Sequence, residues 1–221
     1  MSKKILIIVT SCGESTSGKK TGIWLEEYVI PYLLFKKAGF DITVASVKGG
    51  DAPLDPNSVP DDSSEKKWVD AMSILKTTLS VSDIDPAKYD AVFFPGGHGT
   101  MFDLPNNTAI ANILRHFYDN MKTIAAVCHG PACFIGVTLE GGRPLIAGHT
   151  VTAFTNEEEL AAGHDKDMPF LLESALLEEH ANFLKASEWS DHIETDAILI
   201  TGQNPQSSES VATAVISTLS Q

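Results

Sequence analysis

The chain has few cysteines and no long apolar run. Its 221 residues include three cysteines, Cys12, Cys128 and Cys133, and no C-x-x-C pair. This number and spacing exclude a disulfide framework and do not indicate a zinc or dithiol redox motif. The apolar start at 5–9 is shorter than the core of a signal peptide, and no other run reaches the length of a membrane span. We therefore expect a cytoplasmic protein.

Basic residues are scarce in the last third of the chain. Residues 151–221 contain 13 acidic and 2 basic side chains, which accounts for −11 of the net charge of −13. Such a surface repels phosphate backbones and anionic lipids, so the charge argues against nucleic-acid and membrane partners. The simplest interpretation is a solvated acidic face.

Strand and helix patterns alternate along the chain without internal repeats. The patterns predict strands at 5–9, 41–47, 89–94, 123–127, 150–154 and 197–201, and helices at 22–38 (kinked at Pro31), 65–79, 108–120 (capped by Asn106 or Asn107), within 156–180 and at 205–219. Such alternation is typical of an α/β fold with a doubly wound, mostly parallel sheet and helices on both faces. We expect a single domain over 1–221, in which 48–88 is a connection or insertion with one helix.

The most informative segment is 123–132, where an apolar run stops at Cys128 and a helix-compatible stretch follows. This pattern predicts a nucleophile elbow, a sharp turn that lifts one side chain above the carboxyl edge of a sheet. The positive end of the following helix would favour the thiolate form of Cys128, and His129 comes directly after it. The alternative is a buried structural cysteine.

Three separated segments are expected to meet at this edge of the sheet. The first helix brings Glu26 and Glu27, and a glycine-rich loop brings the backbone amides near Gly97 and His98 toward Cys128. Adjacent helical residues point about 100 degrees apart, so only one glutamate can face the sulfur. Glu27 lies on the more apolar stripe, and burial there would raise its pKa and let it hold or shuttle a proton.

Two further patterns have weaker functional interpretations. His98 and Asp103 could contribute to a metal site, but a hydrogen bond that orders the loop fits two such close residues better, and we predict no metal. The pattern His192-Ile-Glu194 is one that glutamine amidotransferases pair with an elbow cysteine. Because a histidine already adjoins Cys128, we expect His192 at the surface.

The remaining cysteines and the tryptophans are expected to be structural. Cys12 follows the first strand and could lie near the site, whereas Cys133 is expected to pack within its helix. Trp24, Trp68 and Trp189 are expected in the core or in an interface rather than against a substrate.

Five blocks of the sequence, in order, resemble the ThiJ/PfpI superfamily. They comprise 21–28 with Pro31, 95–105, 125–131, 142–145 with Thr152, Phe154, Thr155 and Glu159, and 201–205. More narrowly, they are similar to its stress-inducible branch of glyoxalase III enzymes and holding chaperones. The likeness covers most of the chain.

The resemblance implies a flavodoxin-like fold and a homodimer. By position, it implies Cys128 as the nucleophile, His129 as its neighbour, and Glu27 as the glutamate of the first-helix motif. Glu159 matches an acidic position that supports the histidine, with the acidic residues 157–158 as alternatives.

The implied activity is that of a cofactor-independent glyoxalase. Cys128 would add to the aldehyde carbon of a small 2-oxoaldehyde such as methylglyoxal, and amides near Gly97 and His129 would stabilise the oxyanion. Glu27 and His129 would then move a proton between the two former carbonyl carbons, and water would release a 2-hydroxy acid. A protein deglycase, a holding chaperone and a redox-responsive stress protein are alternatives, while a peptidase or an amidotransferase fits less well. Larger members of the branch have a cap segment and a metal site, and this chain is too short for a large cap.

Overall fold

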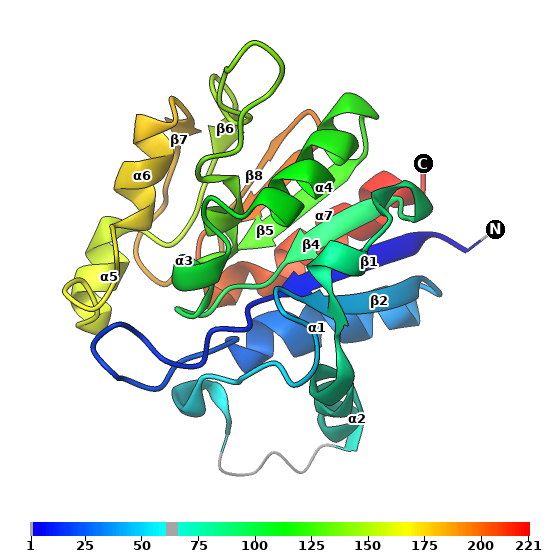
Figure 1. Cartoon of the computed structure of the whole chain (residues 1–221), viewed down its shortest axis with the longest axis horizontal. Helices are drawn as coiled ribbons and strands as arrows, with labels where there is room; N and C mark the ends of the chain where they lie inside the picture. The colour runs from blue at the N-terminus through cyan, green and yellow to red at the C-terminus, as the bar shows by residue number, and fades with distance from the viewer. Residues whose placement is uncertain (1, 61–65) are drawn as a thin grey trace.

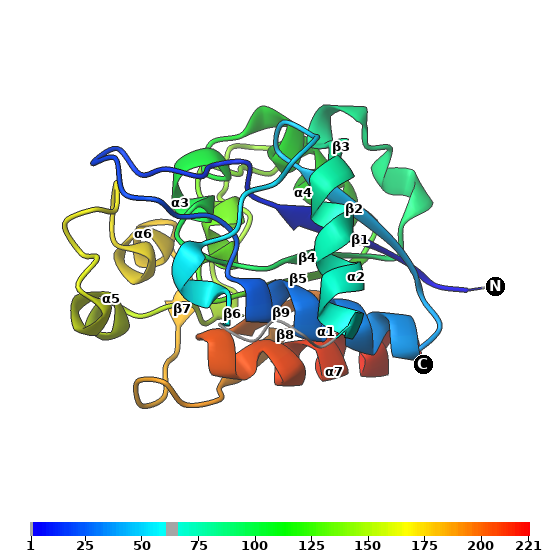
Figure 2. The same cartoon turned by 90° about the horizontal axis from the view of Figure 1, so that it is seen from below.

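The computed structural model describes residues 2–60 and 66–221, and its central feature is a twisted sheet between two layers of helices (Figure 1, Figure 2). The seven strands of this sheet have the order β3-β2-β1-β4-β5-β9-β8. All neighbouring pairs are parallel except β8 and β9. The strands are β1 Lys4–Val9, β2 Asp41–Ser46, β3 Leu79–Ser80, β4 Ala91–Phe94, β5 Thr123–Val127, β8 Ile193–Asp196 and β9 Leu199–Gly202. The predicted α/β fold, with its mostly parallel, doubly wound sheet, is confirmed.

Seven α-helices and several short 3₁₀ helices surround the sheet in the described residues. The α-helices are α1 Leu25–Lys37, α2 Lys66–Ile74, α3 Thr100–Asp103, α4 Thr108–Asp119, α5 Asn156–Ala162, α6 Leu172–Glu178 and α7 Ser208–Leu219. The 3₁₀ helices are η1 Pro56–Ser58, η2 Leu75–Thr77, η3 Val81–Asp83, η4 Pro86–Lys88, η5 Gly130–Phe134 and η6 Pro205–Ser207. Figure 2 shows α1 and α7 together on one side of the sheet and α4 on the other. None of these helices is both long enough and apolar enough to span a bilayer.

The two faces of the sheet are covered by two separate clusters of buried side chains. Along β1, Ile5, Ile7 and Val9 pack with α1 and α7, whereas Leu6 and Ile8 pack with α4. All five side chains are fully buried. Alternate residues of a strand point to opposite faces, so a run that is apolar throughout suits a strand covered on both sides. Each such side chain contributes about 1.5–3 kcal/mol of burial free energy.

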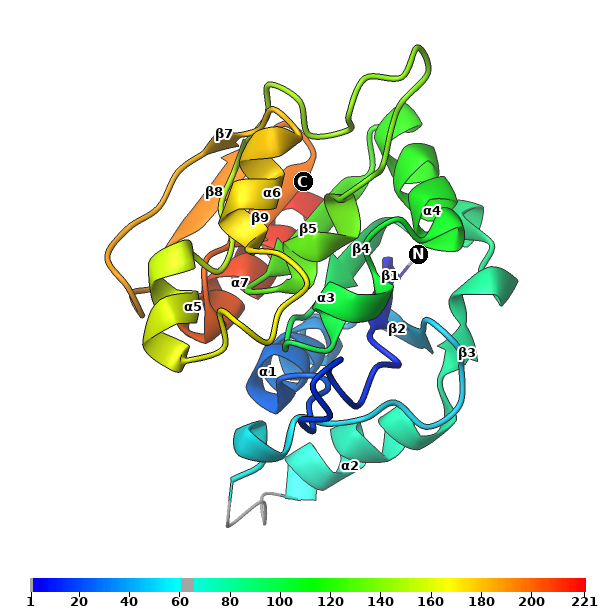
Figure 3. The same ribbon diagram turned by 60° about the vertical axis from the view of Figure 1, so that its left-hand side comes forward.

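Several elements differ from the sequence predictions, among them α3 and β8, which were not predicted. The helix expected at 65–79 ends at Ile74, and β3 follows within the segment 48–88, while Glu65 lies outside the described residues. The strand expected at 150–154 is only β6, Thr150–Val151, and pairs with β7, Asn182–Phe183, in a separate small sheet. The pairing with β7 ends at Val151. Beyond it, the N–H of Phe154 donates to the carbonyl of Cys128 at 3.0 Å, so this part of the chain bonds to the turn after β5 instead. Figure 3 shows β7 on the same flank as α5 and α6.

Two details of the helices also bear on the predictions. Helix α1 continues through Pro31 to Lys37. Asn107, and not Asn106, caps α4, because its side chain accepts the N–H groups of Ala109 and Ile110.

Candidate active site

Cys128 lies in a strained turn directly after β5. Its φ of 59° is in the left-handed region, which costs a non-glycine residue on the order of 1–3 kcal/mol. Two backbone hydrogen bonds fix the turn: the Cys128 N–H donates to Gly202 at 2.9 Å, and its carbonyl accepts from Phe154. Only glycine fits at position 96 beside this turn, because a Cβ there would lie 2.6 Å from the backbone nitrogen of His129. The turn thus has the geometry of the predicted elbow.

The electrostatic setting of Cys128 is the opposite of what we expected. The segment after it is η5, a 3₁₀ helix of five residues, and not an α-helix with a substantial dipole. Burial raises the pKa of the Cys128 thiol, and the adjacent Glu27 carboxyl group raises it further. The prediction of a resting thiolate is therefore wrong. The sulfur needs a base to remove its proton.

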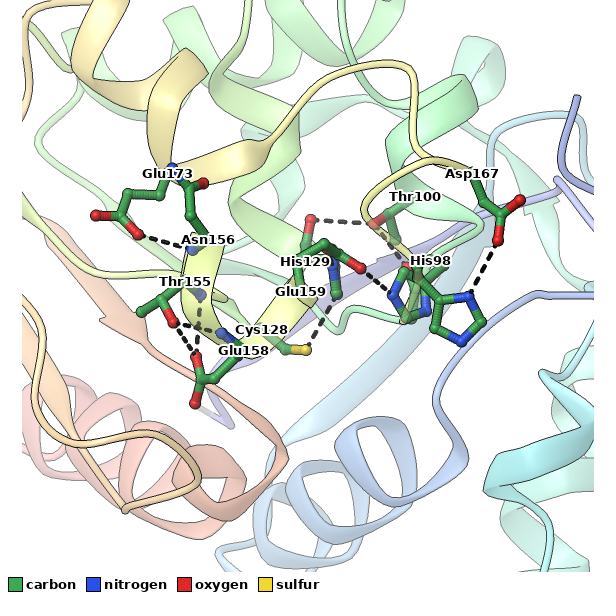
Figure 4. Close-up of polar contacts among 12 residues, drawn as sticks. His98, Thr100, Cys128, His129, Thr155, Asn156, Glu158, Glu159, Asp167 and Glu173 are labelled. Carbon is green, nitrogen blue, oxygen red and sulfur yellow. Dashed lines mark hydrogen bonds and ion pairs between the residues drawn. The ribbon is translucent and has the colours of Figure 1, made fainter. Parts of the chain in front are cut away.

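His129 is placed to be that base. Its Nδ1 lies 3.3 Å from the Cys128 sulfur, and its Nε2 lies 2.7 Å from Oε2 of Glu159 (Figure 4). Burial lowers the pKa of His129, and the neighbouring His98 lowers it further, so the ring is neutral at neutral pH. A neutral ring that donates from Nε2 to a carboxylate presents the lone pair of Nδ1 to the thiol.

Glu159 is shared by two histidines. Besides the Nε2 of His129, its carboxylate accepts the Nε2 of His98, which lies 2.8 Å from Oε1. Burial alone would raise the pKa of Glu159, but its interactions with the two histidines outweigh this effect, and the pKa lies well below its usual range. The structure therefore places an anionic carboxylate behind the catalytic candidate His129.

The two neighbouring acids have other contacts. Glu157 is exposed and forms an ion pair with Lys185 at 2.8 Å. Glu158 is fully buried, but it completes a capping box with Thr155 at the start of α5. Of the three adjacent glutamates, it is thus Glu159 that contacts His129.

Glu27 is the glutamate of α1 that faces the site. Its side chain is fully buried, whereas Glu26 is exposed. Oε2 of Glu27 accepts the N–H of Gly96 at 2.7 Å, and Oε1 has no hydrogen-bond partner within the described residues. Burial raises the pKa of Glu27 to about 8, although contacts with Cys128 and the Gly96 N–H act in the opposite direction. Glu27 is thus a neutral acid at pH 7 with a proton available.

These groups line a cavity of about 320 Å³. Its lining residues are Trp24, Glu27, Asp55, Asn57, Gly97, His98, Cys128, His129, Phe154, Ala162, His164, Trp189 and Pro205. Within the described residues, the N–H of Gly97 donates to no backbone carbonyl, and the N–H of His129 contacts the Cys128 sulfur. They are available to an oxyanion at the base of the cavity.

The family of the chain follows from comparison with known proteins. A model of the DJ-1/PfpI family matches residues 20–218. The chain belongs to the DJ-1/PfpI family. The predicted ThiJ/PfpI resemblance is therefore confirmed.

Relatives of this DJ-1/PfpI chain match it over nearly its whole length. "Glyoxalase 3" of Candida albicans is 34% identical over 96% of this chain and 97% of its own. "Glutathione-independent glyoxalase HSP31" of Saccharomyces cerevisiae is 32% identical over 98% of each chain. The crystal structure of glyoxalase III from Candida albicans superposes with a TM-score of 0.88 at 32% identity, covering 97% of this chain and 96% of that one. The likeness extends to the glyoxalase III branch.

Some residues of this DJ-1/PfpI site were not predicted from the sequence. Trp24 and Trp189 line the cavity, so placing them only in the core or an interface was wrong. His164 also lines it, with its ring centroid 4.6 Å from that of His98. Asn57 comes from the proline-rich connection, where only the Asp-Pro-Asn turn sequence was a signal.

Two other residues considered in the sequence analysis, Asp103 and His192, do not line the cavity. The Asp103 carboxylate accepts hydrogen bonds from the Thr10 hydroxyl at 2.8 Å and from the N–H of Ser11 at 2.7 Å. It therefore orders the loop after β1 and does not pair with His98. Burial raises the pKa of Asp103 to about 6. His192 lies 3.1 Å from Glu194 and does not line the cavity, which removes the amidotransferase arrangement.

The remaining cysteines are also outside the cavity lining. Cys133 is fully buried within η5, and the Cys12 thiol donates to the carbonyl of Glu14 at 3.2 Å. One set of side chains in the described residues has metal-ligand types close together: the ligand atoms of His98, His129 and Glu159 lie within 4.8 Å of one another. Two hydrogen bonds to one carboxylate account for this arrangement.

Proposed function

We propose that this chain is a glutathione-independent glyoxalase that converts methylglyoxal and similar 2-oxoaldehydes to 2-hydroxy acids. The observation that carries the proposal is the meeting of a thiol, a neutral imidazole backed by a carboxylate, and a protonated carboxyl group in one cavity. The names of the two fungal relatives, each matched over nearly the full chain, support the same activity.

The first step of the proposed mechanism forms a hemithioacetal. The Cys128 sulfur bonds to the aldehyde carbon as the thiol proton moves to Nδ1 of His129, and the carbonyl electron pair moves to oxygen. The N–H groups of Gly97 and His129 support this oxyanion. The oxygen then takes the proton from His129, and the imidazole becomes neutral again.

The second step moves hydrogen between the two carbons. His129 removes the proton from the former aldehyde carbon, the electron pair forms a carbon–carbon double bond, and Glu27 protonates the ketone oxygen to give an enediol. His129 then protonates the second carbon, and the Glu27 carboxylate takes the hydroxyl proton of the first. The product is a thioester of Cys128 and a 2-hydroxy acid.

The last step returns the enzyme to its starting state. Water attacks the thioester carbon, with His129 accepting a water proton, and the carbon–sulfur bond breaks to release the 2-hydroxy acid. The leaving thiolate takes the proton from His129. Every proton transfer uses a group that lines the cavity, and Glu159 stabilises the imidazolium formed in each step.

A direct assay tests this function. Purified protein, freed of metals and without glutathione, is incubated with methylglyoxal, and lactate is measured with chiral detection. We expect one lactate enantiomer to accumulate. Absence of lactate, or lactate formation that requires glutathione, would overturn the proposal.

The proposal also includes the organisation of the protein. We infer a single domain over 1–221 with 48–88 as an insertion, and a cytoplasmic homodimer that binds neither nucleic acid nor membranes. The family resemblance and the acidic last third support these inferences. Sedimentation velocity tests the dimer, and a sedimenting species of one chain would contradict it. Cell fractionation tests the location.

A further inference from the structure

The cavity is larger than a three-carbon substrate requires. Methylglyoxal has five non-hydrogen atoms, and at about 30 Å³ for each, the share of a liquid water molecule, it fills less than half of the 320 Å³. The proposed chemistry uses Glu27, Cys128 and His129 with nearby backbone amides. The rest of the lining is free to bind a substituent on the 2-oxoaldehyde.

Aromatic rings line this remaining space from the catalytic histidine outward. The ring of Phe154 lies with its centroid 4.4 Å from that of His129, and Trp189 packs edge-on against Phe154 at 5.5 Å. Trp24 also lines the cavity. Trp189 is 41% exposed although it lines the cavity, so it forms part of the rim.

The backbone of Trp189 is held in an unfavourable conformation. Its φ of 59° is rare for a bulky residue and costs on the order of 1–3 kcal/mol. The N–H of Trp189 donates to Oε1 of Glu158 at 2.8 Å, and the same oxygen accepts the side-chain amide of Asn204 at 2.8 Å. Because Glu158 is fully buried in the capping box of α5, it ties the rim of the cavity to the helix that holds Glu159. A residue that merely covered the surface would not need this anchor.

The charges of the lining argue against an anionic substituent. No lysine or arginine of the described chain lines the cavity. The Asp55 carboxylate already accepts the Oγ1 of Thr21 at 3.0 Å and the N–H of Asn57 at 2.9 Å. An anionic group would meet the Asp55 carboxylate without a fixed positive partner.

We propose that Trp189 is a specificity-determining residue and that the cavity selects 2-oxoaldehydes with a neutral, flat, apolar substituent, of which an aryl group is the simplest. This inference rests on the proposed glyoxalase function. Aromatic pairs are favourable beyond the area they bury, and a ring placed between Phe154, Trp24 and Trp189 gains such contacts.

The test compares phenylglyoxal with methylglyoxal in kcat/KM. We use the wild type, Trp189→Ala, Trp189→Phe and the control Leu177→Ala, whose side chain is 49% exposed on α6 and outside the lining. We expect the ratio of kcat/KM for phenylglyoxal to that for methylglyoxal to fall about tenfold in Trp189→Ala, mainly through the KM of phenylglyoxal. Trp189→Phe should keep most of the ratio, and Leu177→Ala should leave both constants unchanged. Ratios between variants cancel the different intrinsic reactivities of the two aldehydes.

The outcomes separate this inference from the proposed function. If the wild type converts methylglyoxal but Trp189→Ala changes both substrates by one factor, the role of Trp189 is wrong and the glyoxalase function stands. An equal loss of the ratio in Trp189→Phe and Trp189→Ala would mean that a flat ring is not what the site requires. If the wild type converts neither aldehyde, both the function and the inference fail.

Discussion

The carboxylate of Glu159 lies 2.7 Å from Nε2 of His129 and thereby decides which ring nitrogen faces the Cys128 sulfur. With the proton held on Nε2, Nδ1 is free to accept the thiol proton across 3.3 Å. Since burial raises the pKa of the thiol, this base is what makes the sulfur nucleophilic. Catalysis should therefore depend on an acid that never touches the substrate.

Replacing Glu159 should slow the reaction strongly. In Glu159→Gln the amide cannot stabilise an imidazolium, so we expect kcat for methylglyoxal to fall by a factor of about 10² to 10⁴, as for the acid of comparable catalytic triads. Glu157→Gln is the matched control, because Glu157 is exposed and pairs with Lys185. Steady-state kinetics of both variants decide the matter, and equal activity of the two would contradict the assignment.

Removing the sulfur should abolish turnover and preserve the fold. In Cys128→Ala we expect at least a thousandfold loss of lactate formation, because no other group in the cavity can form the hemithioacetal. Cys12→Ala should keep wild-type activity, since Cys12 does not line the cavity. Circular dichroism checks the fold of each variant. Lactate production by a folded Cys128→Ala protein would rule out covalent catalysis at this residue.

The sequence predicts the frame of the site well, because the frame depends on local patterns. An apolar run such as 5–9 can be buried on both faces only in a covered sheet, and small residues around Cys128 permit a strained turn. Topology then brings the ends of β1, β4 and β5 to one edge. These inferences need no knowledge of distant contacts.

The electrostatics and the walls of the cavity were harder to predict. Whether the segment after Cys128 becomes an α-helix or a 3₁₀ helix depends on packing, so the sequence misled us about the thiol pKa. The choice of Glu159 did have a local signal: Thr155-x-x-Glu158 is a capping-box pattern that assigns Glu158 to the helix start. Trp189 is held at the cavity by a hydrogen bond to Glu158, which lies 31 positions earlier in the chain. No local sequence pattern predicts such a contact.

Glu27 should determine the alkaline side of the pH profile. Its pKa of about 8 means that the proton required for the enediol step is lost above that pH. We expect kcat/KM to decline above about pH 8, and also in acid, where His129 becomes protonated at a pKa below the ordinary histidine range.

Substitution of Glu27 tests this assignment. Glu27→Gln should be at least a hundredfold slower, because an amide can donate a hydrogen bond but cannot transfer its proton, and its residual activity should lack the decline near pH 8. The exposed Glu26→Gln should retain both the rate and the profile. The reverse ranking would reassign the acid to Glu26.

The same group should make the stability of the fold depend on pH. Because the pKa of Glu27 is raised from 4.5 to about 8 on folding, the folded chain binds this proton more tightly than the unfolded chain. Its contribution to the free energy of unfolding is complete below pH 4.5 and is lost as the pH rises to about 8. Relative to Glu27→Gln, the wild type should lose stability by about 1.4 kcal/mol per pH unit within this window.

Urea unfolding of the two proteins at several pH values between 5 and 9 measures this difference. The other titrating groups, such as Asp103, are present in both proteins, so their effects cancel in the comparison. The difference in the free energy of unfolding should grow from pH 5 to 8 in favour of Glu27→Gln and then become constant. Parallel curves across the whole range would mean that the carboxyl is ionised in the folded chain, and the proton-transfer role of Glu27 would fall with it.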